Sequence, residues 1–94
     1  MKFEWDDKKA KNNLQKHSVS FEEARSVFTS FLSVDFPDEE HSESEERWLK
    51  LGPSNGNRLL IISYVERGEH IRVISARAAT KREIKAYEER KPRE

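Results

Sequence analysis

The sequence predicts an α+β domain in which an antiparallel sheet has helices packed against it. Stretches typical of strands follow one another in the second half, and the turn sequences at 53–57 and 68–69 separate them. Such short turns favour an antiparallel meander. The capping-box pattern S/T-x-x-E begins a helix at 20–23 and again at 80–83. We expect one domain over residues 1–94, because a chain of this length suits one modest core.

The first half of the chain contains two short strands and two helices. The stretch KFEW alternates polar and aromatic residues, which is typical of a strand. Asp6 and Asp7 follow it and suit the positive N-terminal end of a helix. Phe21, Ala24 and Phe28 recur at helical spacing. We therefore expect, in chain order, a strand at 2–5, a helix at 8–17, a second helix after Ser20, and a strand at 31–36.

The second half contains the longer strands and a final helix. Residues 37–46 hold six acidic residues and no large apolar side chain, so we expect an acidic surface loop there. The stretch RLLIISYVER is apolar on both faces, which is typical of a central strand. After the loop we expect strands at 47–52, 58–67 and 70–78 and a helix at 81–91.

Composition excludes several classes of protein. The chain has no cysteine, so disulfides and thiolate chemistry are ruled out. No apolar run approaches the roughly 18 residues of a membrane-spanning helix, and the first residues lack the apolar core of a secretory signal. The three histidines are far apart in sequence, which predicts no metal site. We therefore expect a cytoplasmic protein that contacts no membrane.

A net charge of zero conceals two halves of opposite sign. Residues 1–46 contain 6 Lys or Arg and 12 Asp or Glu, whereas residues 47–94 contain 12 and 6. The basic half is suited to a polyanion such as RNA, and the acidic loop could restrain that half or face another partner. The alternative is a solvated surface on which the charges happen to segregate, and charge by itself favours this alternative.

Four arginines near strand ends are the first candidates for a functional site: Arg47, Arg67, Arg72 and Arg77. A guanidinium can bind two phosphate oxygens at once and can stabilise the charge that develops during phosphoryl transfer. For a single arginine, an ion pair with the acidic half is the simpler interpretation. Strand alternation predicts that Arg72 and Arg77 point to opposite faces unless a bulge intervenes.

The candidates for acid-base chemistry are weaker. His17 ends the first helix, where a cation is also favoured by the helix dipole. Glu46 beside Arg47 is an alternative base. Tyr87 could contact RNA, but its spacing from Ile84 favours a place in the core. On the residues alone, a structural role is favoured for each of these side chains.

Three blocks of the sequence resemble the BrnT family of type II toxins. They are FEWDDKKAKNNLQKHSVSFEEARSVF, ERWLKLG and RLLIISYVERGEHIRVISARAATKREIKAY, and they cover nearly all of the chain in the family order. The resemblance implies a RelE-like fold with a curved antiparallel sheet. It also implies a ribonuclease that needs no metal ion or other cofactor and arrests growth when free.

The resemblance further implies a partner. A BrnA-type antitoxin with a ribbon-helix-helix part would neutralise the toxin, and the pair would bind operator DNA only through the antitoxin. By motif, Arg67 and Arg77 would hold the scissile phosphate of the RNA, with Arg47 or Lys50 assisting. Either His17 or Glu46 would take the proton of the ribose 2′-hydroxyl.

Further residues are candidates for RNA binding rather than for chemistry. They are Lys50, Arg72, Lys81, Arg82 and Tyr87. The chain departs from the family at Ser18, where glycine is usual after the Lys-His pair. Two other functions remain open: a module of the same fold that binds the antitoxin but no longer cuts RNA, and a stand-alone nucleic-acid-binding domain.

Overall fold

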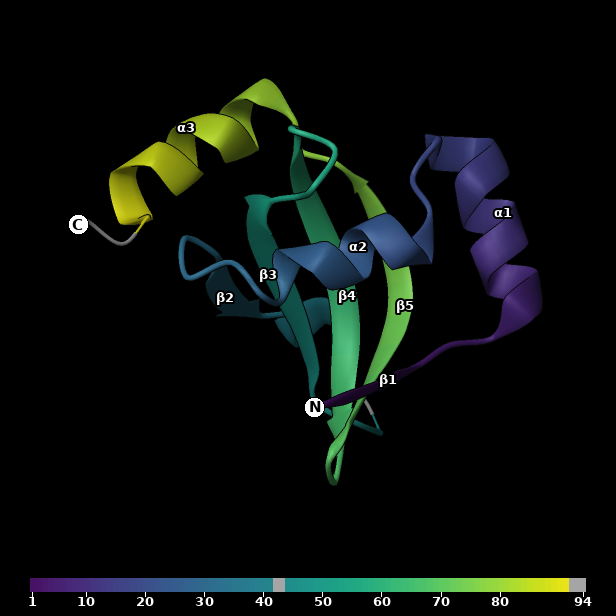
Figure 1. Ribbon diagram of the computed structural model, residues 1–94. Coiled ribbons are helices and arrows are strands. Elements are labelled where there is room, and N and C mark those ends of the chain that lie inside the picture. Colours follow the sequence, from purple (N-terminus) through teal and green to yellow (C-terminus); the bar gives the residue numbers. More distant parts are fainter. Residues whose placement is uncertain (42–43, 92–94) are drawn as a thin grey trace.

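The computed structural model describes residues 1–41 and 44–91, and it has the predicted α+β architecture (Figure 1). Five strands form one sheet in the order β1-β5-β4-β3-β2. The strands from β2 to β5 form the expected antiparallel meander, whereas the short edge strand β1 runs parallel to β5. The strands are β1 (Lys2–Glu4), β2 (Val34–Pro37), β3 (Arg47–Pro53), β4 (Leu59–Arg67) and β5 (His70–Ala78). The helices are α1 (Asp7–His17), α2 (Phe21–Val27), the 3-10 turn η1 (Glu39–His41) and α3 (Lys81–Arg90).

The predicted acidic loop contains regular structure in its described part. Strand β2 includes Pro37, and η1 follows within the segment that the sequence predicts to be loop. Strand β2 begins three residues later than expected, at Val34, because residues 30–33 close a turn through bonds to Ser30. Residues 42–43 of the predicted loop lie outside the described residues. Within the described part of the chain, no helix is long and apolar enough to cross a membrane.

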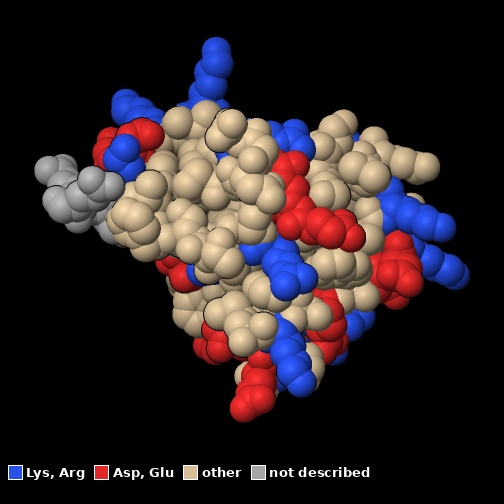
Figure 2. Space-filling view, viewed as in Figure 1, with Lys and Arg blue, Asp and Glu red and all other residues tan. Residues whose placement is uncertain are grey.

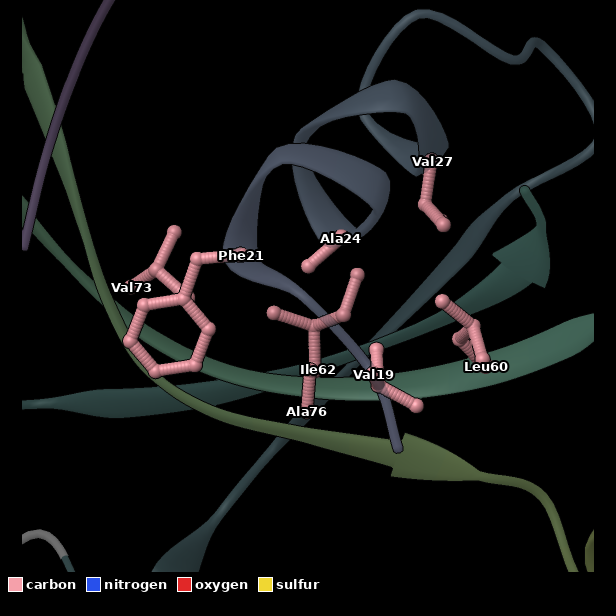
Figure 3. Close-up of a cluster of buried hydrophobic side chains, with 8 residues drawn as sticks. All are labelled: Val19, Phe21, Ala24, Val27, Leu60, Ile62, Val73 and Ala76. Carbon is pink, nitrogen blue, oxygen red and sulfur yellow. The ribbon is translucent and has the colours of Figure 1, made fainter. Parts of the chain in front are cut away.

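The main core lies between α2 and one face of the sheet (Figure 3). Ser20 caps α2 by accepting a hydrogen bond from the backbone of Glu23, as its capping-box spacing predicts. This cap fixes the start of a helix whose apolar residues all face the strands. The residues in this cluster are at most 1 % exposed and comprise Val19, Phe21, Ala24, Val27, Leu60, Ile62, Val73 and Ala76.

A smaller core lies on the opposite face of the sheet, beneath α3. Tyr87 of α3 packs there with Leu51 and Ile61, and its hydroxyl donates to the carbonyl oxygen of Leu32 at 2.8 Å. Figure 1 shows that α3 lies over only the end of the sheet where β5 leads into this helix. The rest of this face is therefore not covered by α3.

Helix α1 is fixed to the open edge of β5 by one buried side chain. The amide of Asn13 donates to the carbonyl oxygens of Val19 and Ala76, at 2.9 and 2.8 Å, and accepts from the backbone N–H of Ala76 at 3.1 Å. It thereby pairs with the strand edge as a neighbouring strand would. Figure 1 shows α1 standing beside β5, at the side of the sheet away from β2.

A bulge interrupts the alternation of side chains along β5. Ser63 of β4 pairs with Ser75, but the next residue, Tyr64, pairs with Val73. Ile74 is therefore an extra residue in β5, and it shifts the alternation of every later side chain by one position.

This bulge overturns the predicted orientation of two arginines. Arg72 pairs with Val65 and Arg77 pairs with Ile61, and residues four apart in β4 point to the same side. Arg72 and Arg77 therefore lie on the same face of the sheet, and the expectation that they point to opposite faces is wrong.

Candidate functional site

Four arginines share the face of the sheet that α3 covers only in part, and we call it the arginine face. It is defined by Arg47, Arg67, Arg72 and Arg77. Arg47 and Arg72 flank Val65 from the two neighbouring strands, so they stand in one row across the sheet. Val65 is only 1 % exposed. The sheet thus gathers guanidiniums from β3, β4 and β5, which are separated by up to 30 positions in sequence.

In the described part of the chain, acidic side chains form ion pairs with Arg67, Arg72 and Arg77. Arg67 makes two hydrogen bonds to Glu45, at 2.9 and 2.7 Å, and Arg72 donates to Glu4 at 2.7 Å. Arg77 makes two hydrogen bonds to Glu83, described below. The three carboxylates come from different parts of the chain: Glu4 from β1, Glu45 from the segment before β3, and Glu83 from α3. The simpler interpretation of the arginines, ion pairing with acidic residues, therefore accounts for part of their placement.

Glu45 lies within the field of three arginines. The hydrogen bonds from Arg67 lower the pKa of the Glu45 carboxyl, and attraction to Arg47 and Arg72 lowers it further. Glu45 comes from the end of the acidic loop, immediately before β3. One acidic residue of the first half thus neutralises part of the basic face, which is one of the two roles that the sequence suggests for the acidic loop.

Arg77 joins the end of β5 to the start of α3. It donates to the two carboxylate oxygens of Glu83 at 2.7 and 2.8 Å. Glu83 also accepts from the backbone of Thr80, which completes the predicted capping box. Together these bonds lower the pKa of Glu83 to about 2, with the hydrogen bonds from Arg77 as the largest cause. The Arg77 side chain stays 41 % exposed, so its outer edge is open to a ligand.

Lys50 lies away from the arginine face. It pairs with Asp35 at 3.1 Å and stands over the rings of Phe28 and Tyr64, on the α2 side of the sheet. Its side chain is 12 % exposed. Burial, together with the hydrogen bond to Asp35, raises the pKa of the Tyr64 phenol. These contacts give Lys50 a packing role and do not bring it to the arginines.

His17 lies at the junction of α1 and β5. It lines a groove together with Lys16 of α1 and with Ile74 and Ser75 of β5. Ser75 stands in register with Ser63, between the rows of Arg72 and Arg77 on the arginine face. His17 therefore reaches the border of that face across the edge of the sheet.

Glu46, the other candidate base, has different surroundings. It lines a groove with Glu45, Glu66 and Trp48. Trp48 and Glu66 point to the α2 side, because their positions in β3 and β4 alternate with those of Arg47 and Val65. A groove with three carboxylates repels RNA, so the geometry favours His17 over Glu46 as a base.

The candidates on α3 divide into two kinds. Lys81 and Arg82 occupy the exposed first turn of the helix, next to the capping box. Tyr87 is 4 % exposed, and its hydroxyl is already engaged by Leu32. Its ring therefore cannot stack on a base, which argues against the expected RNA contact and supports the place in the core that its spacing favours.

The structure adds site residues that the sequence does not single out. Glu4, Glu45 and Ser75 lie on or beside the arginine face, and Asn13 holds α1 next to it. Asn13 could have been noticed as a polar residue within the helix, although nothing in the sequence identifies its distant partner. Among residues 1–41 and 44–91, no three His, Asp or Glu side chains are grouped so that they could hold a metal ion.

Comparison with known proteins identifies the family. Residues 5–83 match the family described as ribonuclease toxin, BrnT, of type II toxin-antitoxin system. The chain belongs to the BrnT family. A crystal structure of the Brucella abortus ribonuclease toxin BrnT superposes with a TM-score of 0.68 at 26 % sequence identity. The alignment covers 86 % of this chain and 99 % of the Brucella chain. Among curated proteins, no sequence matches the chain significantly.

Membership of the BrnT family confirms the resemblance inferred from the three sequence blocks and gives the chain the family's class, a ribonuclease toxin of a type II toxin-antitoxin system. The matched region includes every arginine of the arginine face as well as His17 and Glu83. It ends before Tyr87, the buried residue of α3.

Proposed function

We propose that this BrnT-family chain cuts RNA without a metal ion, by attack of a ribose 2′-hydroxyl on the neighbouring phosphate. The 2′-oxygen forms a bond to phosphorus, the bond to the 5′-oxygen breaks, and a 2′,3′-cyclic phosphate remains. A base takes the proton of the 2′-hydroxyl, and the departing 5′-oxygen takes up a proton from solvent. The observation that carries this proposal is the placement of Arg47, Arg67, Arg72 and Arg77 on one face of the sheet, where the Ile74 bulge puts Arg77 on the same side as Arg72.

Arg77 is the proposed ligand of the scissile phosphate. Arg67, which the family motifs suggest for the same phosphate, lies six residues along β4 from Ile61, the partner of Arg77. Six residues of a strand span about 20 Å, so Arg67 would bind a different phosphate of the RNA. Extra negative charge develops on the phosphate oxygens as the 2′-oxygen attacks, and guanidiniums fixed nearby stabilise it. Arg77 is held by Glu83 yet keeps an exposed edge, so it is oriented before RNA arrives. Arg47 and Arg72 share one row of the sheet, between the rows of Arg67 and Arg77, and would bind phosphates that lie between those two arginines.

His17 is the proposed base. Its groove meets the arginine face at Ser75, whereas Glu46 lies among other carboxylates. Neutral imidazole accepts a proton near pH 7, which suits a base that must work in the cell interior. We further propose that the toxin acts in the cytoplasm on cellular RNA, and that a BrnA-type ribbon-helix-helix antitoxin neutralises it.

The decisive experiment compares two single variants that both break the same ion pair. Purified wild type, Arg77→Ala and Glu83→Gln are incubated with single-stranded RNA in excess chelator. We expect cleavage by the wild type and by Glu83→Gln, since both retain the guanidinium, and a loss of about 100-fold or more for Arg77→Ala. If the two variants cleave RNA at the same rate, the guanidinium of Arg77 is not needed for cleavage, and Arg77 acts only through its ion pair with Glu83.

A second candidate function rests on the ion pairs themselves. Arg67, Arg72 and Arg77 are bound to carboxylates within the described part of the chain, which suits a module that binds an antitoxin without cutting RNA. Induced expression separates the two functions. Growth arrest and RNA fragments, both abolished by Arg77→Ala and by the co-expressed neighbouring gene product, support the ribonuclease. Normal growth with intact RNA supports the binding module.

A further inference from the structure

A shallow groove between α1 and β5 is not part of the site proposed above, apart from His17 at its end. Its volume is about 200 Å³, and α1 lines it with Lys9, Asn12 and Lys16. The opposite wall is the bulge of β5. The amide of Asn13 ties α1 to the strand edge through two hydrogen bonds with Ala76, so both walls are fixed relative to each other.

The side chains that line the groove carry a net positive charge. Lys9 and Lys16 are two helical turns apart, which places them along one stripe of α1, and His17 stands beside the second lysine. Among residues 1–41 and 44–91, no acidic side chain lines the groove. The arginine face differs, because carboxylates already bind three of its guanidiniums. At the right edge of Figure 2, in the region of α1, basic side chains stand beside acidic ones, and the rest of this view also mixes both signs.

The groove continues onto the arginine face. Ser75 lines the groove, and it also lies on the arginine face between the rows of Arg72 and Arg77. The bulge at Ile74 brings the two arginines to one side of the sheet, and Ile74 itself lines the groove beside Ser75. One extended strand of RNA could therefore follow the arginine face and cross the edge of β5 into the groove.

From this continuity we propose that the groove binds the phosphate backbone of the RNA strand next to the cleavage point. Lys9 and Lys16 contact two phosphates and position the strand, with no part in the chemistry. Asn12 supports them as a neutral hydrogen-bond donor. The inference rests on the proposed ribonuclease function and extends it by a second binding region, whose ligand is single-stranded RNA irrespective of its base sequence.

The same helix supplies a matched control. Lys8 and Lys11 lie on α1 but do not line the groove. The double variants Lys9→Gln/Lys16→Gln and Lys8→Gln/Lys11→Gln therefore remove equal charge from one element. The probe is a fluorescent single-stranded oligonucleotide of about ten nucleotides, with 2′-O-methyl groups so that it is bound but not cut. Its affinity is measured by anisotropy over a series of salt concentrations.

We expect the groove variant to bind the probe roughly three- to tenfold more weakly and to lower the salt slope by about 1.4, the value for two phosphate contacts on a single strand. The control variant should keep the wild-type slope. In cleavage assays of unmodified RNA, the groove variant should show a raised KM at unchanged kcat, because it loses binding away from the reacting phosphate.

Four results would overturn the inference, and they differ from one another. Wild-type binding by the groove variant, together with active wild-type enzyme, rejects the groove and leaves the ribonuclease standing. Equal losses in both double variants mean that the helix acts only through its total charge. Weaker binding of the purified antitoxin, with RNA affinity unchanged, makes the groove a protein contact. If the wild type neither binds nor cuts RNA, the ribonuclease function fails and this inference fails with it.

Discussion

Arg77 and Glu83 form a two-bond ion pair that ties the last strand of the sheet to the first turn of the helix that follows it. The same carboxylate caps that helix through the backbone of Thr80. One acidic residue therefore orients a proposed phosphate ligand and fixes the element that covers the second core. The pair explains how an exposed arginine can be preorganised for binding.

The Glu83 pair should make stability depend on pH in the acid range. The pKa of Glu83 is about 2 in the folded chain, below its ordinary value of 4.5, because Arg77 and Thr80 bind the ionised form. A carboxyl whose pKa is lower in the folded than in the unfolded chain stabilises the fold when it is ionised. Glu83 therefore contributes stability above about pH 4.5, and this contribution is lost as the pH falls toward 2. We expect Glu83→Gln to lower the free energy of unfolding at pH 7, on the order of 1–2 kcal/mol.

Urea unfolding of the wild type and Glu83→Gln, at pH 7 and near pH 2.5, measures this effect. The difference in unfolding free energy between the two proteins should shrink at the lower pH, where the Glu83 carboxyl is protonated in the unfolded chain and partly protonated in the folded chain. A difference that stays constant with pH would contradict the assignment of the lowered pKa to this pair.

Removing the negative charge of Glu45 should strengthen RNA binding. Its carboxylate binds Arg67 and attracts Arg47 and Arg72, so an incoming phosphate must displace it or share its partners. We expect Glu45→Gln to raise affinity for the 2′-O-methyl oligonucleotide about three- to tenfold. Glu39→Gln, which removes one charge from the neighbouring turn η1, should have a smaller effect. Equal gains would indicate that only total charge matters.

The order and type of the elements could be predicted from the sequence because local signals mark them. Caps at Ser20 and Thr80 begin their helices as expected, and the turn sequences produce the antiparallel meander. The short strand β1 is predicted, but its parallel pairing with β5 is not, since no local pattern specifies a partner so distant in sequence.

The site was harder to predict, because its geometry depends on one extra residue. Ile74 sits within an apolar strand and carries no glycine or other signal of a bulge, so simple alternation gives the wrong face for Arg77 relative to Arg72. The carboxylate partners Glu4, Glu45 and Glu83 are also set by the fold. Only the pairing across Thr80-x-x-Glu83 has a local signature.

Asn13 should be among the most sensitive positions in the chain. Asn13 is 6 % exposed, and its amide pairs with the buried carbonyl oxygen of Val19 and with the buried carbonyl oxygen and N–H of Ala76 at the edge of β5. Asn13→Ala leaves these groups without partners, so we expect a loss of about 2–4 kcal/mol in the free energy of unfolding. The exposed neighbour serves as the control, because Asn12→Ala should change stability by less than about 0.5 kcal/mol.

The two asparagine variants can be compared by urea unfolding and by hydrogen exchange. The amide of Ala76 should exchange faster in Asn13→Ala, since its acceptor is removed. Unchanged protection of that amide, with wild-type stability, would mean that α1 is held to the sheet by other contacts.

Ser18 offers a substitution that should stabilise the fold. It ends α1 with φ 57° and ψ 33°, the left-handed conformation that glycine adopts without steric cost. Its two contacts use the backbone, because its N–H donates to Leu14 and its carbonyl oxygen accepts from Arg58. Ser18→Gly keeps both contacts and relieves the strained conformation, so we expect a gain of about 0.5–1 kcal/mol.

Thermal or urea unfolding of Ser18→Gly against the wild type tests this expectation, with Ser30→Gly as the contrasting variant. The Ser30 hydroxyl accepts from the N–H of Leu32, and Ser30 has no positive φ, so glycine there should destabilise the fold. RNA cleavage by Ser18→Gly should equal that of the wild type, because the position of His17 is kept. Destabilisation by Ser18→Gly would show that the flexibility gained in the unfolded chain outweighs the relief of strain at this helix end.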